Sequence, residues 1–224
     1  MAHRSSLTSP SPTPARRTRR KEARPAEMIE AARDLFIERG FAATKLEDVA
    51  RRAGVSVGLP YVYFENKAGL FKAVVRESVL PNLVLGEELL ESYTGSSEEL
   101  LRLIVAGYWQ MNGEPAAGLP KLVVAEAGNF PDLARFYVEE VVMRGRAFFA
   151  RVLQRGIDRG EFRPVDVQQM ARVVSAPLSL LTIWSHSLAP YEIDPGATAE
   201  GFLDAYLDLV LHGLRAAPKD TTDA

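Results

Sequence analysis

Residues 29–70 decide the fold and have the sequence IEAARDLFIERGFAATKLEDVARRAGVSVGLPYVYFENKAGL. Apolar residues between Ile29 and Phe36 recur at helical spacing, and Gly40 is a natural stop for that helix. The segment Thr44–Glu47 predicts a capping box, in which the threonine hydroxyl and the glutamate carboxylate accept hydrogen bonds from backbone amides. A second, short helix should therefore begin here.

A tight turn, Ala53–Ser56, is expected after this second helix because Gly54 breaks the helical pattern. Ser56 is then the natural cap of a third helix over Val57–Tyr63. Two short helices joined in this way form a helix-turn-helix, which presents its second helix to the major groove of DNA.

The residues of the third helix suit contact with DNA. Gly58 has no side chain, so the backbone can approach closely, and Tyr61 and Tyr63 offer hydroxyls that can reach phosphates. Thr44 and Lys67 lie at the starts of flanking helices, where they can clamp the DNA backbone. The same tyrosines could instead be packing aromatics, and Lys67 could be a solvated lysine.

The ordered set of small, aromatic and capping residues from Ala31 to Leu70 resembles, without a gap, the DNA-binding signature of the TetR family of transcriptional regulators. The resemblance implies that the helix after the Gly-Val-Ser turn enters the major groove. The DNA contacts expected from the motif and the resemblance are Thr44, Lys45, Ser56, Val57, Gly58, Leu59, Tyr61, Val62, Tyr63 and Lys67.

Two positions depart from the family pattern. Leu59 stands where a small polar residue is usual, and it could touch a thymine methyl group. Pro60 stands where leucine or isoleucine is usual. As the fourth residue of the predicted helix, Pro60 would remove at most the first intrahelical hydrogen bond.

The remainder of the chain also predicts helices, and no alternating strand pattern of useful length occurs. The fold class is therefore all-α, with about nine helices counting the three of the head. Pro81 should kink or divide the first of the later helices, whereas Asp166 and Asp194 are plausible starts for the last two. The expected later helices span residues 67–92, 97–111, 116–128, 131–159, 166–188 and 195–216.

Charge and composition divide the chain into a basic head and an acidic body. Residues 1–72 carry 14 Lys/Arg against 8 Asp/Glu, while the rest carries 13 against 21, so the head should meet a polyanion. Residues 1–24 predict a disordered basic arm, which either enters the minor groove or adds only nonspecific attraction. We expect a helix-turn-helix domain at 25–72, a ligand-binding and dimerisation domain at 73–217 and a disordered tail at 218–224.

Several classes of protein are disfavoured by composition. The chain has no cysteine, which fits a cytoplasmic protein, and no secretory signal or membrane-spanning run is visible. No zinc-binding, nucleophile-elbow or phosphate-loop motif occurs, so we expect neither an enzyme nor a metal or cofactor. A helical module that binds protein rather than DNA stays possible, and the salt dependence of DNA binding would separate the two.

The family resemblance implies that the C-terminal helices form a ligand pocket and a dimer interface. We expect the last two helices to pair with those of a second subunit and to hold two heads over a palindromic operator. A small, largely apolar effector would then shift the heads and release the repressor. The pocket candidates are Trp109, Met111, Glu126, Phe130, Tyr137, Phe148, Phe149 and Trp184.

These pocket candidates have alternatives of their own. Each aromatic could be an ordinary core residue, and Glu126 needs a partner or solvent because its neighbours are apolar. His186 is more typical of an interface histidine than of a ligand group. The segment from Leu122 to Arg163 also resembles the AefR-like C-terminal domain of some of these regulators, which implies no particular ligand.

Overall fold

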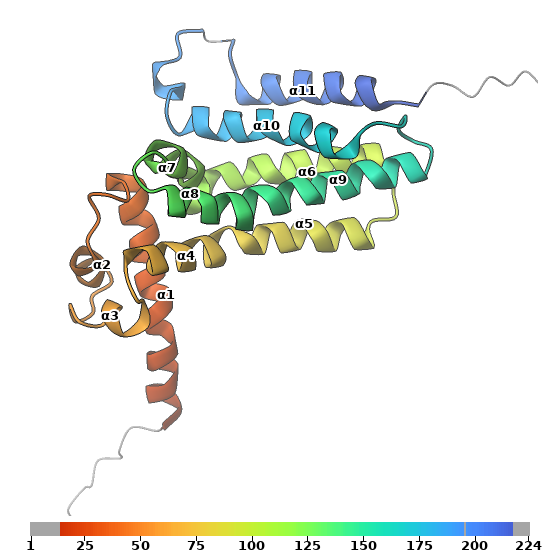
Figure 1. Cartoon of the computed structure of the whole chain (residues 1–224). Coiled ribbons are helices and arrows are strands. Elements are labelled where there is room, and N and C mark those ends of the chain that lie inside the picture. The colour runs from red at the N-terminus through yellow and green to blue at the C-terminus, as the bar shows by residue number, and fades with distance from the viewer. Residues whose placement is uncertain (1–13, 195, 217–224) are drawn as a thin grey trace, which may run out of the picture.

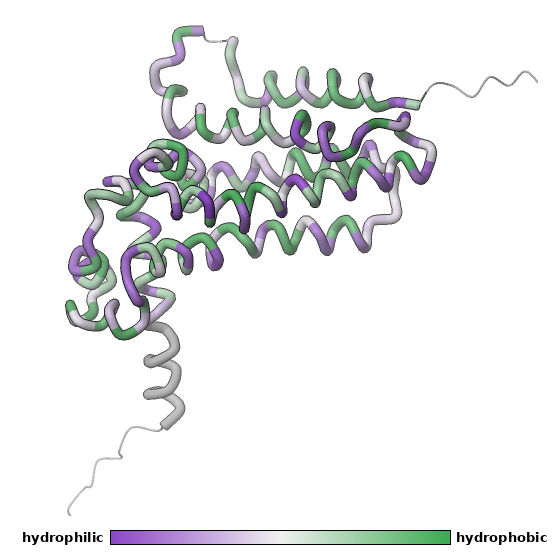
Figure 2. Tube along the Cα trace, viewed as in Figure 1, coloured by the Kyte–Doolittle hydropathy of each residue, from purple (hydrophilic) through white to green (hydrophobic). Residues whose placement is uncertain are grey.

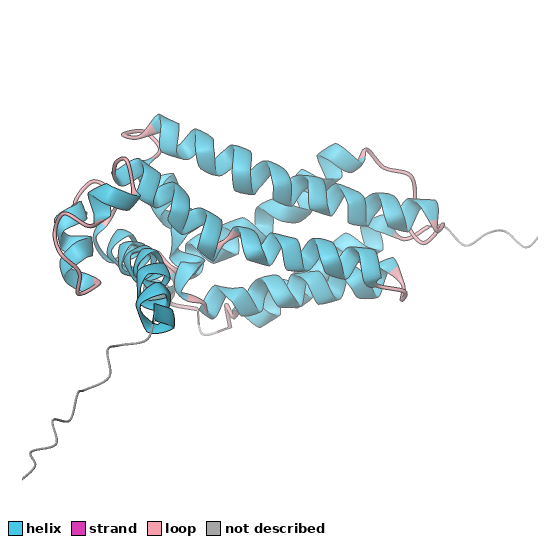
Figure 3. Ribbon diagram, turned by 90° about the horizontal axis from the view of Figure 1, so that it is seen from below, coloured by secondary structure: helices cyan, strands magenta, loops and turns pink. Residues whose placement is uncertain are grey.

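A computed structural model describes residues 14–194 and 196–216, with side chains from residue 25 onward. The all-α prediction is confirmed, since the described part contains helices, turns and a single isolated bridge between Phe162 and Arg215. Figure 3 shows this all-helical construction from below. The nine predicted helices correspond to eleven labelled α-helices, because two of them are divided.

The head consists of four helices at the left of Figure 1. The long α1 runs beside the short α2 and α3, and α4 leads from the head into the body. The bounds are α1 (Pro14–Arg39), α2 (Leu46–Arg52), α3 (Pro60–Tyr63) and α4 (Lys67–Ser78).

The first helix begins earlier than expected. α1 starts at Pro14 and runs through Pro25, which we had predicted as its first residue. The expectation of disorder through residue 24 is therefore wrong for residues 14–24. The reason is that this stretch consists largely of alanine, arginine, lysine and glutamate, which are good helix formers. The arm at 1–13 and the tail at 218–224 lie outside the described residues.

The body extends to the right of the head as long helices lying side by side (Figure 1). Among these, α9 packs along both α6 and α10, and α5 packs on α9. The bounds are α5 (Leu80–Ser92), α6 (Ser97–Gln110), α7 (Leu119–Glu126), α8 (Pro131–Tyr137), α9 (Met143–Asp158), α10 (Val167–Ser185) and α11 (Ala199–Leu214), with 3-10 turns at Met111–Gly113, Pro115–Gly118 and Ala189–Tyr191.

The two divided helices have different causes. α4 and α5 are separated at Val79, and Pro81 occupies the first turn of α5, so the predicted division at this proline is confirmed. The long apolar stripe predicted over 131–159 forms α8 and α9, joined by a π-helical segment at Val138–Val142. A π-helical segment widens one turn without ending the helix.

The starts of the last two helices test the capping predictions. Asp166 caps α10 as predicted, because its carboxylate accepts hydrogen bonds from the amides of Gln168 and Gln169. The start predicted at Asp194 is wrong. Its carboxylate accepts from the amide of Gly196 within a turn, and α11 begins later, where the Thr198 hydroxyl accepts from the amide of Gly201.

Buried apolar residues form two clusters that do not follow the order of the chain. The head cluster joins α1, α2 and α4 to α7 and α8, which lie beyond the predicted boundary at residue 72. The body cluster joins α5, α6, α9, α10 and α11. Helices of the two clusters alternate along the sequence, so α7 and α8 belong by packing to the head.

Hydrogen bonds close the far end of the body, where α6 and α9 meet. The Arg155 guanidinium donates to the carbonyls of Tyr93 and Gly95 and to the hydroxyl of Ser97. The carboxylate of Glu161 accepts from the amide of Ser97 over 2.5 Å. This end is therefore fixed by polar contacts as well as by the body cluster.

Candidate nucleic-acid interface

The turn between α2 and α3 is held by its own backbone. The amide of Ala53 donates to the Val49 carbonyl, and the amide of Val55 donates to the Ala50 carbonyl, each over 2.9 Å. Gly54 adopts a φ of +66°, a conformation that favours glycine. Val55 packs against the head cluster. The angle between α2 and α3 is therefore fixed by the turn and by the core beneath it.

The recognition helix is shorter than predicted. α3 begins at Pro60, because proline lacks the amide that would continue a helix from Ser56. The Leu59 amide instead donates to the Ser56 carbonyl over 2.9 Å in a tight turn, and no side chain caps α3. The predictions of a cap at Ser56 and of a helix starting at residue 57 are thus wrong.

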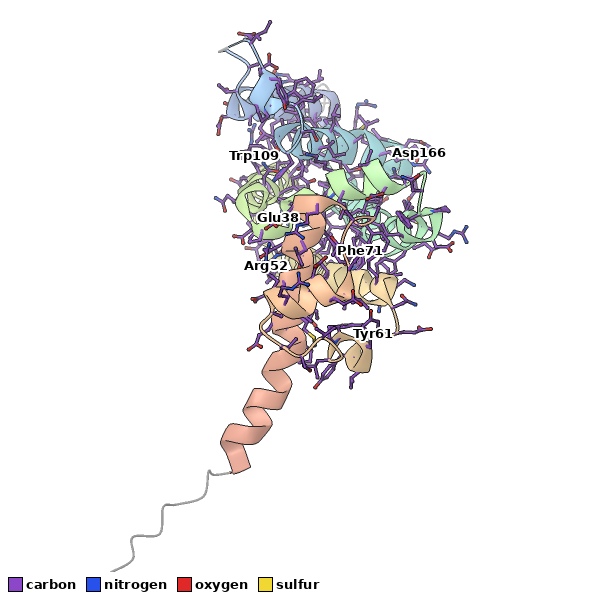
Figure 4. All side chains as sticks on the ribbon, turned by 90° about the vertical axis from the view of Figure 1, so that its left-hand side faces the viewer. Glu38, Arg52, Tyr61, Phe71, Trp109 and Asp166 are labelled. Carbon is purple, nitrogen blue, oxygen red and sulfur yellow. The ribbon has the colours of Figure 1, made fainter. Side chains whose placement is uncertain are left out.

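The tip of the head carries an exposed surface that no other part of the described chain covers. The side chains are 55% exposed at Val57, 54% at Tyr61 and 76% at Val62. Figure 4 shows Tyr61 at the outer end of the head, far from Trp109 of the body. We call this the recognition surface; its members are Lys45, Ser56, Val57, Gly58, Tyr61, Val62 and Tyr63, all of them exposed.

A hydrogen bond inside the head positions one residue of the recognition surface. The hydroxyl of Tyr61 donates to Oε1 of Glu47 over 2.6 Å, which ties α3 to the first turn of α2. This bond lowers the pKa of Glu47 and raises the pKa of Tyr61. A phosphate oxygen approaching Tyr61 would have to compete with Glu47 for the hydroxyl proton.

Thr44 does not have the role that the sequence predicted. Its side chain is 1% exposed, and its hydroxyl donates to the Gly40 carbonyl over 2.8 Å, with the Leu35 carbonyl at 3.2 Å. The residue before α2 is Lys45, which makes no side-chain cap. The capping box is therefore wrong, and a buried, engaged hydroxyl cannot clamp a phosphate. Thr44 instead satisfies carbonyls at the end of α1.

Lys67 is bonded mainly within the head, which limits its contact with DNA. Its ammonium donates to the carbonyls of Phe41 and Ala42 over 2.6 and 3.0 Å and lies 4.5 Å from the centre of the Phe41 ring. Burial lowers the pKa of Lys67, and the charge of Glu126 opposes part of that shift. Two of its three donors are thus used inside the protein, which leaves one for a phosphate.

Leu59 and the end of α2 complete the support of the recognition surface. Leu59 is half-buried and packs on the head cluster, so its side chain anchors the turn rather than lying free for a thymine methyl. Glu38 of α1 and Arg52 of α2 form a two-pronged ion pair, with contacts of 3.0 and 2.8 Å (Figure 4). The two contacts of this ion pair join α2 to α1.

The eight predicted pocket residues are not brought together. Tyr137 is buried in the head cluster, and the ring of Phe130 packs edge-on against that of Phe41 at 4.8 Å. Phe148 and Phe149 are buried in the body cluster, where Trp109 packs against it, while Trp184 is 40% exposed on α10. Met111 is half-buried in a 3-10 turn.

Glu126 has a partner that sequence reasoning missed. Its side chain is 9% exposed, and Oε1 accepts a hydrogen bond from the amide of Ala42 over 3.0 Å. Ala42 lies in the turn after α1, whereas Glu126 ends α7, so this bond ties α7 to the helix-turn-helix region. The only signal in the sequence was an acidic residue in an apolar run; its partner is a backbone amide, which no pattern reveals.

The outer side of α10 and α11 carries many large apolar side chains. Figure 2 shows hydrophobic residues recurring along α11 between hydrophilic ones. Large side chains on these two helices and their connection remain exposed: Val173, Leu180, Trp184, Leu188, Tyr191, Ile193, Phe202 and Leu209. An accumulation of exposed large apolar side chains is typical of an interaction site. No group of three or more potential metal ligands occurs among the described residues, and no helix there is long and apolar enough to cross a membrane.

A helix-turn-helix head with an exposed recognition surface, joined to an all-helical body, defines a DNA-binding transcriptional regulator. The family model described as bacterial regulatory proteins, tetR family, matches residues 28–74, and the model described as tetracyclin repressor-like, C-terminal domain, matches residues 92–190. The chain belongs to the TetR family. It is therefore a transcriptional regulator rather than an enzyme, and regulators of this family bind DNA operators and small-molecule effectors as dimers.

Individual relatives agree with this assignment. The HTH-type transcriptional repressor KstR2 of Mycolicibacterium smegmatis is 26% identical over 196 residues, covering 87% of this chain and 92% of that protein. The HTH-type transcriptional regulator YfiR of Bacillus subtilis is 30% identical over 147 residues, covering 65% and 71%. The solved ketosteroid transcriptional regulator KstR2 of Mycobacterium tuberculosis has a TM-score of 0.62 at 25% identity, covering 87% and 96%. The narrower AefR-like resemblance stays a prediction.

Proposed function

We propose that this regulator binds a palindromic operator as a homodimer through its recognition surface and leaves the operator when a small, largely apolar effector binds in the body. The single observation that carries DNA binding is the recognition surface itself. Apolar and aromatic side chains are held outward there by the bond between Tyr61 and Glu47 and by the packing of Leu59. Its place of action in this proposal is the bacterial cytoplasm, where an operator is accessible.

The two ends of the recognition surface have different proposed tasks. Lys45, Ser56 and Tyr61 supply charge or hydroxyls for phosphates, which position the protein on DNA. Val57, Gly58 and Val62 are proposed to lie against base edges in the major groove, where apolar side chains read thymine methyl groups. Lys67 adds at most one donor to a phosphate. Thr44 is not part of this proposal.

The dimer is proposed to form through α10 and α11. The exposed fractions of Leu180 and Leu209, 62% and 74%, are high for leucines in the middle of helices. A four-helix bundle made with the same two helices of a second copy would cover them. Such a dimer would hold two recognition surfaces about one DNA turn apart, roughly 34–36 Å.

The effector is proposed to bind among α5, α6 and α9. Phe148 and Phe149 lie there with ring centres 5.6 Å apart, and Trp109 packs nearby. Gly86 of α5 faces Phe148 so closely that a Cβ atom would lie 3.2 Å from the ring. The name of the KstR2 relative refers to a ketosteroid, and this supports an apolar effector here, since pockets for such ligands are lined by aromatic and aliphatic side chains.

Titration of the purified chain against DNA from upstream of its own gene tests the proposal, with the salt concentration varied. Val62→Glu should abolish specific binding, whereas Leu103→Ala, on the exposed side of α6, should leave it unchanged. Affinity should fall steeply with salt, because neutralised phosphates release counterions. If selection from random sequences also returned no preferred site, specific DNA binding would be excluded.

The dimer has its own test in sedimentation of the full chain. Leu180→Glu and Leu209→Glu should convert a dimer to a monomer, because each places a charge in the proposed interface. Leu103→Glu is the matched control, since Leu103 is 48% exposed on α6. A wild-type monomer at all concentrations, or a dimer that survives both changes, would contradict the interface.

A further inference from the structure

A cavity of about 200 Å³ lies at the contact between head and body, away from the body region proposed for the effector. Ile37 and Gly40 at the end of α1 form one side of it. Leu122 and Glu126 of α7 form another, and His186, just after α10, closes it. The cavity opens to solvent on one side, so a ligand can enter without separating the head from the body.

The first polar group of the cavity is the carboxylate of Glu126. Only Oε1 is used inside the described part of the chain, where it accepts from the amide of Ala42. Oε2 has no hydrogen-bond donor among those residues and is reached by solvent, since none of their buried side-chain oxygens lacks a partner. The Lys67 ammonium, whose pKa the charge of Glu126 raises, donates to two backbone carbonyls instead. An accessible carboxylate oxygen without a donor can accept a hydrogen bond from a ligand that enters the cavity.

The second polar group is the ring of His186. Its Nδ1 lies 3.0 Å from the Thr182 carbonyl and 3.2 Å from the Ser185 hydroxyl. Because a carbonyl oxygen only accepts, Nδ1 carries the proton, and Nε2 of the neutral ring is an acceptor. The remaining charge, the Lys121 ammonium, already donates to the backbone carbonyl of His186 over 2.6 Å.

The lining therefore offers one carboxylate acceptor and apolar walls, with the Lys121 ammonium already bonded at the edge. We propose that this cavity binds a compact organic ammonium ion, whose N–H groups donate to Oε2 of Glu126 and whose hydrocarbon part lies against Ile37 and Leu122. An engineered apolar cavity of about 150 Å³ holds benzene, so a ring with one short substituent is the appropriate size. The site does not depend on the effector proposed for the body.

Benzylammonium is a suitable probe, with benzoate and benzyl alcohol as partners of similar size. Binding to the full chain is followed by amide chemical shifts and by thermal unfolding. We expect benzylammonium to bind with a dissociation constant of about 1 mM, since it has few atoms. Benzyl alcohol should bind at least tenfold more weakly, and benzoate should not bind. Equal binding of all three, or no binding of benzylammonium, would overturn the proposal.

Three variants locate the site. Glu126→Gln keeps an acceptor for the Ala42 amide but removes the charge, so benzylammonium should bind at least tenfold more weakly. Ala125→Phe fills the exposed side of the cavity without altering Glu126, and it should also prevent binding. Glu139→Gln changes an exposed carboxylate elsewhere and should have no effect. Binding that survives both Glu126→Gln and Ala125→Phe would place the ligand elsewhere and refute the assignment.

These measurements are made on the ligand-free and probe-bound chain without DNA. A failure of benzylammonium to bind would leave operator binding untouched, and a failure to bind an operator would leave the chemical shifts of the probe complex unchanged. The two proposals therefore stand or fall separately.

Discussion

The hydroxyl of Tyr61 lies 2.6 Å from Oε1 of Glu47, so the recognition helix is tied to the helix before it through a carboxylate that faces the side expected to meet DNA. The arrangement keeps the Tyr61 ring in place while the protein is free. It also places a negative charge where phosphates would approach, so each of the two residues has an effect on DNA binding that can be separated by substitution.

Tyr61→Phe should weaken operator binding about three- to tenfold, the effect of one lost hydrogen bond to a phosphate. The ring remains, so packing is preserved, and thermal stability should hardly change because the bond to Glu47 is exposed. Fluorescence anisotropy with labelled operator measures the affinity, and Tyr93→Phe, which removes a hydroxyl bonded to Glu99 at the far end of the body, is the control. Unchanged affinity would mean that the hydroxyl serves only Glu47.

Glu47→Gln should tighten operator binding about two- to fivefold, because a neutral amide oxygen still accepts from Tyr61 while the charge beside the phosphates is gone. The salt dependence of binding should change little, since no cation is added. Asp48→Asn in the same turn removes a charge without a bond to Tyr61 and provides the comparison. If both variants tightened binding equally, net charge alone would account for the effect.

Lys67→Met should lower the free energy of unfolding by about 1–3 kcal/mol, because two carbonyls in the turn after α1 lose their donor. Lys72→Met on the same helix is the control. The Lys72 ammonium lies 5.3 Å from the centre of the Phe136 ring and donates no hydrogen bond among the described residues, so its loss should matter less. Chemical denaturation compares the two variants, and equal losses would contradict the structural role of Lys67.

Gly156→Ala should destabilise the body by about 1–3 kcal/mol, because a Cβ atom at this position would overlap the ring of Phe162. Gly107→Ala in α6 meets no atom within 4 Å and should be neutral or stabilising, since alanine is the better helix former. Thermal unfolding compares the stabilities of the two variants. Equal stabilities would show that the Phe162 ring moves aside at little cost.

Glu161 should make stability depend on pH in a defined window. Burial alone would raise the pKa of this carboxyl, but the hydrogen bonds from Ser97 and Arg159 outweigh it and lower the pKa to about 2. The stabilisation is therefore present above the unfolded value of 4.5 and is lost as the pH falls toward 2. Because the side chain is 25% exposed, we expect Glu161→Gln to cost only about 1 kcal/mol at neutral pH. The difference from wild type should disappear near pH 2, and a difference independent of pH would contradict this origin.

Local signals predicted the fold well. The helix break at Pro81, the cap at Asp166 and the stop at Gly40 each depend on a property of one residue and its neighbours in the chain, so they can be inferred from sequence. The same holds for the turn at Gly54. Two of the boundaries that failed, at Pro14 and Pro60, lie in segments where helix propensity and proline act against each other.

The site was less predictable because its contacts join distant parts of the chain. Thr44 stands in a sequence that predicts a helix cap, yet its hydroxyl donates to the Gly40 carbonyl at the end of the preceding helix. Glu126 meets a backbone amide 84 positions away, and a backbone amide has no sequence signature. The pocket assignment stays a prediction, and periodicity could not assign Phe130 to one cluster and Phe149 to the other.

The alternation of the two apolar clusters along the chain has a consequence for dissecting the molecule. The polypeptide leaves the head cluster after α4, returns to it for α7 and α8, and leaves it again. No single cut in the chain can therefore yield an intact head and an intact body. A fragment ending at residue 78 would expose the ring of Phe41, against which Phe130 packs, and it should aggregate rather than act as a miniature DNA-binding protein.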